Sequence, residues 1–534
     1  MKKLLFFAVT ALLALSCGRR NEPAVKNVIE PLPGGAIALQ GGFENDIQNC
    51  IEHWNMGVMP YEKVIEFFRT GRAQFALGEM AGKALRSDAK MYRYTQDPAL
   101  KELTKKYNIE YAPGKVVPTD DDELDAIWQA GKELLLDVGI LNVSTERRIT
   151  FTEDELEEAL ENLPTEVTLG EGKDAVTISH RGFEDYDSGR TPVGTMGRIL
   201  GPISDDLYEK VALSYAQEPL IDYVHFQGVK EKVNGIPVKP GSPFEMMAEI
   251  QHVSTVKDVL RRVNRPGFPD GGSTPVNLRA EMAAANPLWG VGKGDVRHVY
   301  IMPQLKTDYD QMCRAYFWHQ YGANIWGILQ SYIGGAAGGP ATSAVNGVAD
   351  LLAYVMLYEP TILGTWPTDA LYFSNSSKYA LYVANYGGAA FQKHTHFPSL
   401  VGAAWQMTAG IGSEEYFWET AAGAIGSATL GFLVAGGTGH QSAGLDHACG
   451  LGARFAAEVG RAVGKARLTR VQANDLVNKI LPKYQPLIDN RTLHTKGGDF
   501  RTVYDLETVQ PKPEYLAIYN KVKAELREMG LPIK

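Results

Sequence analysis

Two polar residues follow an apolar stretch of the sequence and carry groups that can act on a substrate. His225 and Gln227 lie at the end of residues 220–226 (LIDYVHF), whose composition predicts a strand. Asp295 follows a glycine-rich segment further along the chain. An imidazole or carboxyl group can give a proton to a leaving group, so His225 and Asp295 are candidate acids. The alternative for each is an ordinary polar residue satisfied by hydrogen bonds at a strand end.

The glycine-rich segment before Asp295 does not have the pattern of a phosphate-binding loop. Residues 290–294 (GVGKG) include Lys293, but no serine or threonine follows this lysine. Nucleotide binding is therefore not predicted here.

The histidines and cysteines form no metal or nucleophile motif. His394 and His396 flank one threonine, and His440 and His447 lie in a glycine-rich region. Zinc needs three or four protein ligands in catalytic or structural sites, so we interpret these as loop histidines and predict no metal site. Cys449 is not preceded by the strained Gly-x-Ser-x-Gly type of turn that exposes a nucleophile.

The first seventeen residues predict export and lipid attachment. Lys2 and Lys3 precede the apolar run 4–15, and Cys17 follows Ser16. This order is typical of a bacterial lipoprotein signal, in which the new N-terminal cysteine receives lipid. We expect a lipoprotein on a cell-envelope membrane that faces the periplasm or the cell surface. The alternative is an ordinary cleaved signal beside an incidental cysteine.

Composition and charge limit the remaining classes. The chain has 534 residues, of which 45% are hydrophobic, so it can build a large core and is not disordered or collagen-like. A net charge of -9 without a dense Lys/Arg stripe excludes nucleic acid as a partner. We divide the chain into a signal peptide (1–17), a Pro/Gly-rich tether (18–42), a helical extension (43–110) and one large domain (111–534).

Local signals predict several elements of this large domain. A helix is expected over 119–139, with Thr119 as its cap and Gly139 as its stop. Capping boxes are expected at Thr152–Glu155 and at Ser242–Glu245, the second with a proline at the first helical position.

Helices and short apolar strands alternate beyond residue 165, which predicts an eightfold (β/α)8 barrel of the TIM type. Small-residue clusters at 334–339, 387–390 and 436–439 are expected at strand ends or tight turns. The active face of such a barrel lies at the carboxyl ends of its strands. The domain is therefore predicted to be a TIM-type barrel with an N-terminal helical extension.

Collinear segments over about residues 100–532 resemble the monomethylamine methyltransferases of methylamine-using methanogens. The segments that carry the resemblance are 105–124, 147–163, 167–181, 201–219, 240–250, 263–268, 450–464 and 503–531. The resemblance implies the (β/α)8 barrel and transfer of a methyl group from a methylated amine to the cobalt of a partner corrinoid protein. It implies no directly bound cofactor, and a symmetric homo-oligomer.

The sequence departs from this family at the residue that defines its chemistry. Members carry pyrrolysine on the barrel face, and we align that position with the stretch 289–295, at Gly292 beside Lys293. A glycine forms no adduct with an amine, and a lysine offers an amine where the chemistry uses an imine. Among the family's flanking residues we match only an amide, Gln406, which with Gln227 is a candidate for substrate binding.

These observations leave two hypotheses for function. The first is an enzyme that moves a methyl group from a methylated amine, including a quaternary one, to a corrinoid cobalt, with Gly292, Lys293, Asp295 and His225 at its site. The second is a catalytically inactive, lipid-anchored receptor for a small amine or corrinoid. Barrel mouths suit the capture of small molecules in either case.

Overall fold

The structure, a computed structural model, describes most of the chain beyond residue 97. Described are residues 98–534 except 146, 227, 229, 273–274, 276, 303–304, 330, 336, 371, 373, 403–406 and 440–444, together with the short strands β1 (Glu30–Pro31) and β2 (Ile37–Ala38). Cys17, Gln227, Gln406 and His440 thus lie outside the described residues, as do the signal peptide and most of the tether and the helical extension. What was predicted for them stays a prediction.

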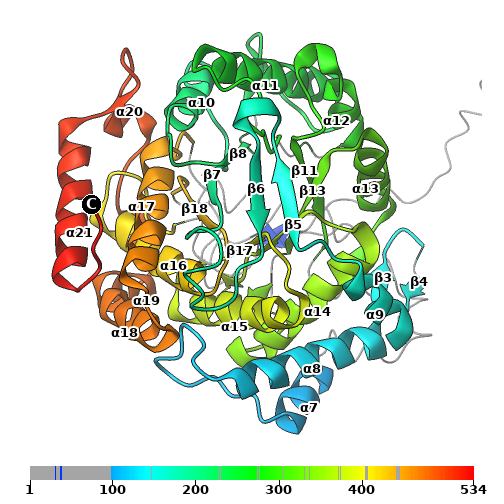
Figure 1. Cartoon of the computed structure of the whole chain (residues 1–534). Coiled ribbons are helices and arrows are strands. Elements are labelled where there is room, and N and C mark those ends of the chain that lie inside the picture. Colours follow the sequence, from blue (N-terminus) through cyan, green and yellow to red (C-terminus); the bar gives the residue numbers. More distant parts are fainter. Residues whose placement is uncertain are drawn as a thin grey trace, which may run out of the picture.

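Eight parallel strand segments close into the predicted barrel (Figure 1). Seven of them are β7 (Thr195–Ile199), β8 (Tyr223–Phe226), β11 (Val296–Tyr300), β13 (Asn324–Leu329), β15 (Ile362–Thr365), β17 (Leu400–Val401) and β18 (Val434–Gly436). The eighth is the segment around Asp270, which bridges Val224 of β8 and accepts a hydrogen bond from the amide of Val296 of β11 at 2.9 Å. A bridge between Val401 and Leu433 joins β17 to β18, and β18 pairs with β7.

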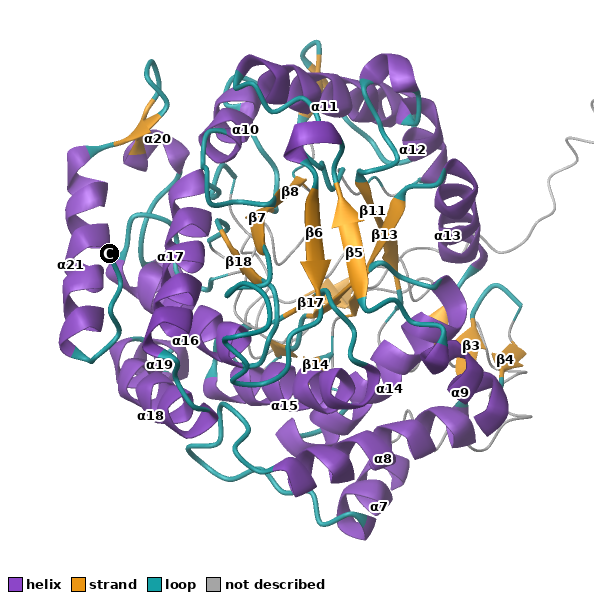
Figure 2. Ribbon diagram, in the orientation of Figure 1, coloured by secondary structure: helices purple, strands orange, loops and turns teal. Residues whose placement is uncertain are grey.

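A helix follows each strand segment and covers the outside of the barrel (Figure 2). In chain order these are α10 (Tyr208–Ala216), α11 (Pro243–Arg262), α12 (Leu278–Ala284), α13 (Tyr309–Tyr321), α14 (Pro340–Tyr358), α15 (Lys378–Thr395), α16 (Glu414–Thr429) and α17 (Gly450–Ala466). The small residues at 436–439 begin at the end of β18, as predicted. Those at 387–390 lie inside α15, where Gly387 lets that helix approach α14: an added Cβ would lie 3.1 Å from the carbonyl oxygen of Ala344.

The predicted helix boundaries are confirmed in part. The helix α8 covers Asp121–Val138 and stops at Gly139, but its cap is Asp120, whose side chain accepts from the amide of Asp122. The capping box at Thr152–Glu155 is present at the start of α9 (Glu153–Glu161). The second box is wrong, because Ser242 makes no capping bond and Glu245 accepts from the amide of Gly241.

Further elements extend the barrel at both ends of the chain. Before it come α7 (Pro98–Lys106), β3 (Ile140–Asn142), β4 (Arg147–Ile149) and the antiparallel hairpin of β5 (Glu166–Leu169) and β6 (Val176–Ser179). After it come α18 (Arg470–Ile480), α19 (Gln485–Asp489), α20 (Phe500–Val503), β19 (Tyr504–Asp505), β20 (Gln510–Pro511) and α21 (Pro513–Glu528). Loops carry the short strands β9 (Lys232–Val233), β10 (Ile236–Pro237), β12 (Lys306–Thr307), β14 (Tyr332–Ile333) and β16 (Thr368–Asp369).

One helix of the described chain, α14, is long and apolar enough to cross a membrane. Most of this helix is buried against the barrel and against α8 and α15. A helix buried in the core of a domain has the same length and composition, and α14 is buried in this way.

Candidate active site inside the barrel

The hairpin of β5 and β6 covers the amino ends of the barrel strands (Figure 2). Val167 and Ile178 of this hairpin belong to the same apolar cluster as Val296, the first residue of β11. The amide of Gly170 donates to the carbonyl of Gly294, just before β11, at 2.9 Å. Because the amino end is covered, a ligand has to enter at the carboxyl ends, where TIM-barrel enzymes place their active sites.

Strand alternation turns a group of polar and aromatic side chains into the barrel. On β8, Val224 and Phe226 pack outward against the helices, so Tyr223 and His225 point inward. The same alternation on β7, β11 and β13 adds four more inward residues. We call this set the lumen cluster: Arg198, Tyr223, His225, His298, Tyr300 and Trp326.

Members of the lumen cluster are in direct contact with one another. The guanidinium of Arg198 donates to Nδ1 of His225. Arg198 also lies over the ring of Trp326, with 5.1 Å from Cζ to the ring centroid. The ring of His225 is 3.8 Å from that of Trp326 and 5.3 Å from that of His298. The side chains of the lumen cluster therefore form a connected polar surface inside the barrel.

The two lumen imidazoles are neutral. Burial, followed by the charge of Arg198, lowers the pKa of His225 well below its ordinary value, and the same two causes lower the pKa of His298. Burial also lowers the pKa of Arg198. At neutral pH the imidazoles can therefore exchange hydrogen bonds, but they hold no positive charge of their own.

A buried carboxyl group fixes the loop that follows β17. Glu419 of α16 accepts hydrogen bonds from the amides of Thr408 and Ala409 at 2.7 and 2.8 Å, and from the hydroxyl of Ser376. Burial raises the pKa of Glu419 to about 7. This carboxyl ties the loops after β15 and β17 together at the carboxyl end of the barrel.

A second buried carboxyl group holds the loop after β11. Asp350 of α14 accepts from the amide of Leu305 at 2.9 Å and from the side-chain amide of Asn346 at 2.7 Å. Burial raises the pKa of Asp350 to about 7. Opposite it on the rim, Asp446 accepts from the amide and the hydroxyl of Ser204, both at 2.7 Å. The rim is thus held by side chains from the surrounding helices and loops.

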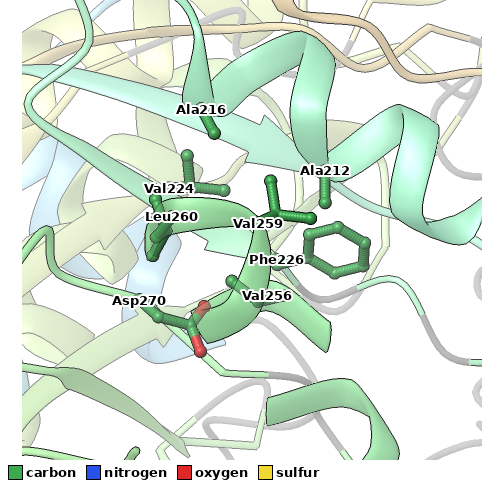
Figure 3. Close-up of a pocket in the computed structure, with 8 residues that line it drawn as sticks. All are labelled: Ala212, Ala216, Val224, Phe226, Val256, Val259, Leu260 and Asp270. Carbon is green, nitrogen blue, oxygen red and sulfur yellow. The ribbon is translucent and has the colours of Figure 1, made fainter. Parts of the chain in front are cut away.

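A small cavity lies on the outer side of the barrel wall, between β8 and the helices α10 and α11 (Figure 3). Its lining is apolar except for Asp270; the lining residues are Ala212, Ala216, Val224, Phe226, Val256, Val259, Leu260 and Asp270. Asp270 accepts from the amide of Gly272 at 3.1 Å, so it shapes the end of its own strand. This cavity lies behind the wall and does not open into the lumen cluster.

Comparison with known proteins decides the family. The family model described as monomethylamine methyltransferase MtmB matches residues 78–531. Monomethylamine methyltransferase MtmB2 of Methanosarcina acetivorans is 30% identical over 433 residues, which is 80% of this chain and 92% of the relative. The MtmB protein of Methanosarcina mazei is 29% identical with the same coverage. The chain belongs to the monomethylamine methyltransferase family.

A solved structure of this family has the same fold. The crystal structure of the Methanosarcina barkeri monomethylamine methyltransferase superposes with a TM-score of 0.76 at 26% identity, over 84% of this chain and 95% of that one. A complex of that protein with hydroxylamine matches equally well. The TIM-barrel fold and an enzyme of the methylamine methyltransferase family, both expected from the sequence, are confirmed.

The predicted family position at Gly292 and Lys293 is at the wrong end of the barrel. Both residues precede β11, and Lys293 is exposed on a loop at the amino end. A Cβ at Gly292 would lie 2.5 Å from Oε1 of Glu171, which belongs to the hairpin loop that covers this end. A family active site on the carboxyl face cannot include these two residues. The sequence alone does not show that β11 begins only at Val296, after both residues.

Asp295 is a structural residue of the same end. It accepts hydrogen bonds from Nζ of Lys257 at 2.6 Å, from the amide of Asp270 at 2.9 Å and from the amide of Gly292 at 2.8 Å. Asp295 is buried, and these donors occupy both of its oxygens. These bonds favour the alternative interpretation of Asp295, a polar residue satisfied by hydrogen bonds at a strand end, over a proton donor for a leaving amine.

His225 alone among the described candidates faces the lumen. His394 lies in the last turn of α15 and not in a loop as predicted; its ring stacks on Trp128 and its Nε2 donates to the carboxylate of Asp125, while His396 caps the end of the helix. Within the described residues no group of three His, Cys, Asp or Glu side chains is placed to hold a metal ion.

The sequence search missed Arg198, His298, Tyr300 and Trp326. Each belongs to a short strand in which every second side chain faces the barrel interior, as in TMGRI (195–199) and VRHVY (296–300), but the inward set mixes apolar and polar residues. Period-two alternation in register with LIDYVHF could have placed Arg198 and His298 beside His225.

Proposed function

We propose that this chain transfers the methyl group of a methylated amine to the cobalt of a corrinoid carried by a partner protein. The observation that carries the proposal is the donor site inside a family barrel: Arg198 and His225 at the floor of the lumen. The solved family member in complex with hydroxylamine supports a small amine ligand for this site. No cofactor need bind this chain, because the corrinoid supplies the nucleophilic cobalt from its own protein.

Methyl transfer requires a hydrogen-bond donor beside the nitrogen atom of the amine. The bond between nitrogen and the methyl carbon breaks, its electron pair stays on nitrogen, and nitrogen takes up one proton to leave as ammonia or a less methylated amine. The carbon forms its new bond with the electron pair of the reduced cobalt. His225 and Arg198 would orient the nitrogen and stabilise the negative charge that develops on it. In this proposal His225 and Arg198 orient the amine, so the reaction does not require pyrrolysine, which the sequence lacks.

An anaerobic absorbance assay tests this function. Full-length protein, monomethylamine and reduced cobalamin are mixed, and the conversion to methylcobalamin is followed together with the release of ammonia. We expect both products in equal amounts. Ammonia is expected from monomethylamine only, so the proposal would be contradicted if no methylcobalamin formed with mono-, di- or trimethylamine or with tetramethylammonium.

We also propose that residues 1–17 direct export of the chain and that lipid on Cys17 anchors it to a cell-envelope membrane, with the barrel facing the periplasm or the cell surface. Labelling of cells with a radioactive fatty acid tests this, with Cys17→Ser against the control Cys313→Ser. The label should be lost in the first variant only. An equal label on both variants would show that Cys17 is not the site.

The anchor favours a second function, a lipid-anchored receptor for a small amine or corrinoid. A receptor would bind the ligand in a calorimeter yet transfer no methyl group. The absorbance assay and calorimetry together therefore separate the two functions. Assembly into homo-oligomers is a further proposal from the family, and the mass in solution checks it.

A further inference from the structure

The floor of the barrel carries a buried cation. Arg198, His225 and Trp326 each have no measurable exposure to solvent. Arg198 is the only formally charged side chain among the inward-facing described residues of the strands β7, β8, β11 and β13. The undescribed positions beyond residue 146 contribute no aspartate or glutamate by sequence. The inner wall of these strands is therefore positively charged.

The contact with Arg198 fixes the proton of His225. A guanidinium can only donate, so Nδ1 of His225 has to accept and its single proton sits on Nε2. Nε2 is buried and has no hydrogen-bond partner among the described residues. It is thus a donor held in place for an acceptor that the described chain does not supply.

The aromatic ring that a cationic ligand would use is already in contact with other groups. A quaternary ammonium is recognised by the face of a tryptophan or tyrosine within about 6 Å. Arg198 lies over the ring of Trp326 at 5.1 Å, and the ring of His225 lies 3.8 Å away. A second cation against the ring of Trp326 would lie beside the positive charge of Arg198.

We propose that the lumen takes its amine as the neutral base, whose lone pair accepts a hydrogen bond from Nε2 of His225, and that it rejects quaternary ammonium compounds. The inference rests on the proposed function and specifies its substrate class. Tetramethylammonium has no lone pair and a permanent charge, so it fails both conditions. The charged or titratable groups that act most on the pKa of His225 are Arg198 and His298 in the lumen, with Arg297 and His252 behind the wall. The carboxyl group of Asp270, on the segment packed against His225, lines the cavity behind the wall and not the lumen.

Calorimetric titration of the full chain tests the inference without a corrinoid. Methylamine is almost wholly protonated near neutral pH, and its neutral fraction grows about tenfold for each pH unit well below its pKa. The apparent affinity for methylamine should therefore rise by about tenfold per unit between about pH 6 and about pH 8. Tetramethylammonium should not bind at any of these pH values.

Two variants locate the effect at the lumen. Arg198→Met removes the charge while keeping much of the side-chain volume, so it should flatten the pH dependence and admit tetramethylammonium. Arg181→Met is the matched control, because Arg181 is equally buried but donates to the carbonyls of Asp185 and Ala428 away from the lumen. This control should keep the behaviour of the unmodified chain. The comparison of the two amines on the unmodified chain stands even if Arg198→Met does not fold.

The outcomes separate this inference from the proposed function. Binding of tetramethylammonium as tight as that of methylamine, an affinity for methylamine that does not change with pH, or no binding of any amine overturns the inference. Methyl transfer from tetramethylammonium to cobalamin would overturn it while supporting the function. Binding of methylamine that rises with pH, without methyl transfer, would support the inference and overturn the function.

Discussion

Arg198 donates a hydrogen bond to Nδ1 of His225 inside the barrel, which places the proton of that imidazole on Nε2. The contact connects two neighbouring strands, β7 and β8, at residues that pair in register. It joins a fixed positive charge to a fixed donor, and both are shielded from water by the barrel. A site of this kind stabilises negative charge on a leaving group more strongly than water can.

Replacing His225 should separate hydrogen bonding from packing. His225→Phe keeps an aromatic ring but loses Nε2, so methyl transfer from methylamine should slow by about 100-fold or more. His225→Gln retains an N–H donor and should recover part of that loss. Initial rates in the absorbance assay measure both. Equal rates for His225→Phe and the unmodified chain would show that Nε2 has no role.

Gly271 should be irreplaceable beside the imidazole. A Cβ at this position would lie 2.4 Å from Cδ2 of His225 and 2.7 Å from its Cα. Gly271→Ala should therefore lower the free energy of unfolding by about 1 to 3 kcal/mol and abolish amine binding. Gly347→Ala is the control, because a Cβ there meets nothing within 4 Å. Denaturant unfolding should show that the control is as stable as the unmodified chain or more so.

The residues before β11 should matter for stability and not for chemistry. Asp295→Asn leaves Lys257 without its buried partner, so the free energy of unfolding should fall by about 3 to 5 kcal/mol. Lys293→Ala changes an exposed loop at the amino end and should alter neither stability nor methyl-transfer rate. A large loss of activity in a folded Lys293→Ala protein would contradict the placement of the site at the carboxyl end.

Glu419 should make stability depend on pH. Its pKa is about 7 in the folded chain, whereas an unfolded glutamate has its ordinary value of 4.5. Between these values the folded chain binds more protons than the unfolded chain, so stability falls as pH rises from about 5 to about 7. Glu419→Gln carries no charge and should remove this part of the slope.

Thermal unfolding at several pH values measures the slope. Glu414→Gln serves as the control, since Glu414 lies on the same helix at the surface and pairs with Lys521. This control should keep the slope of the unmodified chain. A Glu419→Gln protein with the unmodified slope would show that Glu419 ionises freely in the folded state.

The barrel could be predicted from the sequence because its signals are local and repeated. The capping box at Thr152–Glu155 and the stop at Gly139 depend on neighbouring residues, and each was found. The predictions that are wrong depend on contacts between residues that only the folded chain shows. Glu245 has the spacing of a capping box, but in the fold its carboxylate bonds the amide of Gly241.

The site could be predicted only at His225. That residue ends an apolar strand that is visible in the sequence, and its inward direction follows from alternation. Gly292 and Asp295 looked equally plausible, because the sequence does not say on which side of a glycine-rich segment a strand begins. Arg198 could not be predicted, because an arginine in a short strand such as TMGRI has the composition of a surface residue and is buried only once the barrel closes around it.

The central claim is that the amine reacts beside Arg198 and His225 inside the barrel. Single-turnover transfer from methylamine carrying a ¹³C-labelled methyl group to reduced cobalamin, followed by mass spectrometry of the cobalamin, tests it most directly. The account predicts labelled methylcobalamin from the unmodified chain and from Arg181→Met, with a loss of about 100-fold or more in His225→Phe. Labelled product at undiminished rate from a folded His225→Phe protein, or none from the unmodified chain, would contradict it.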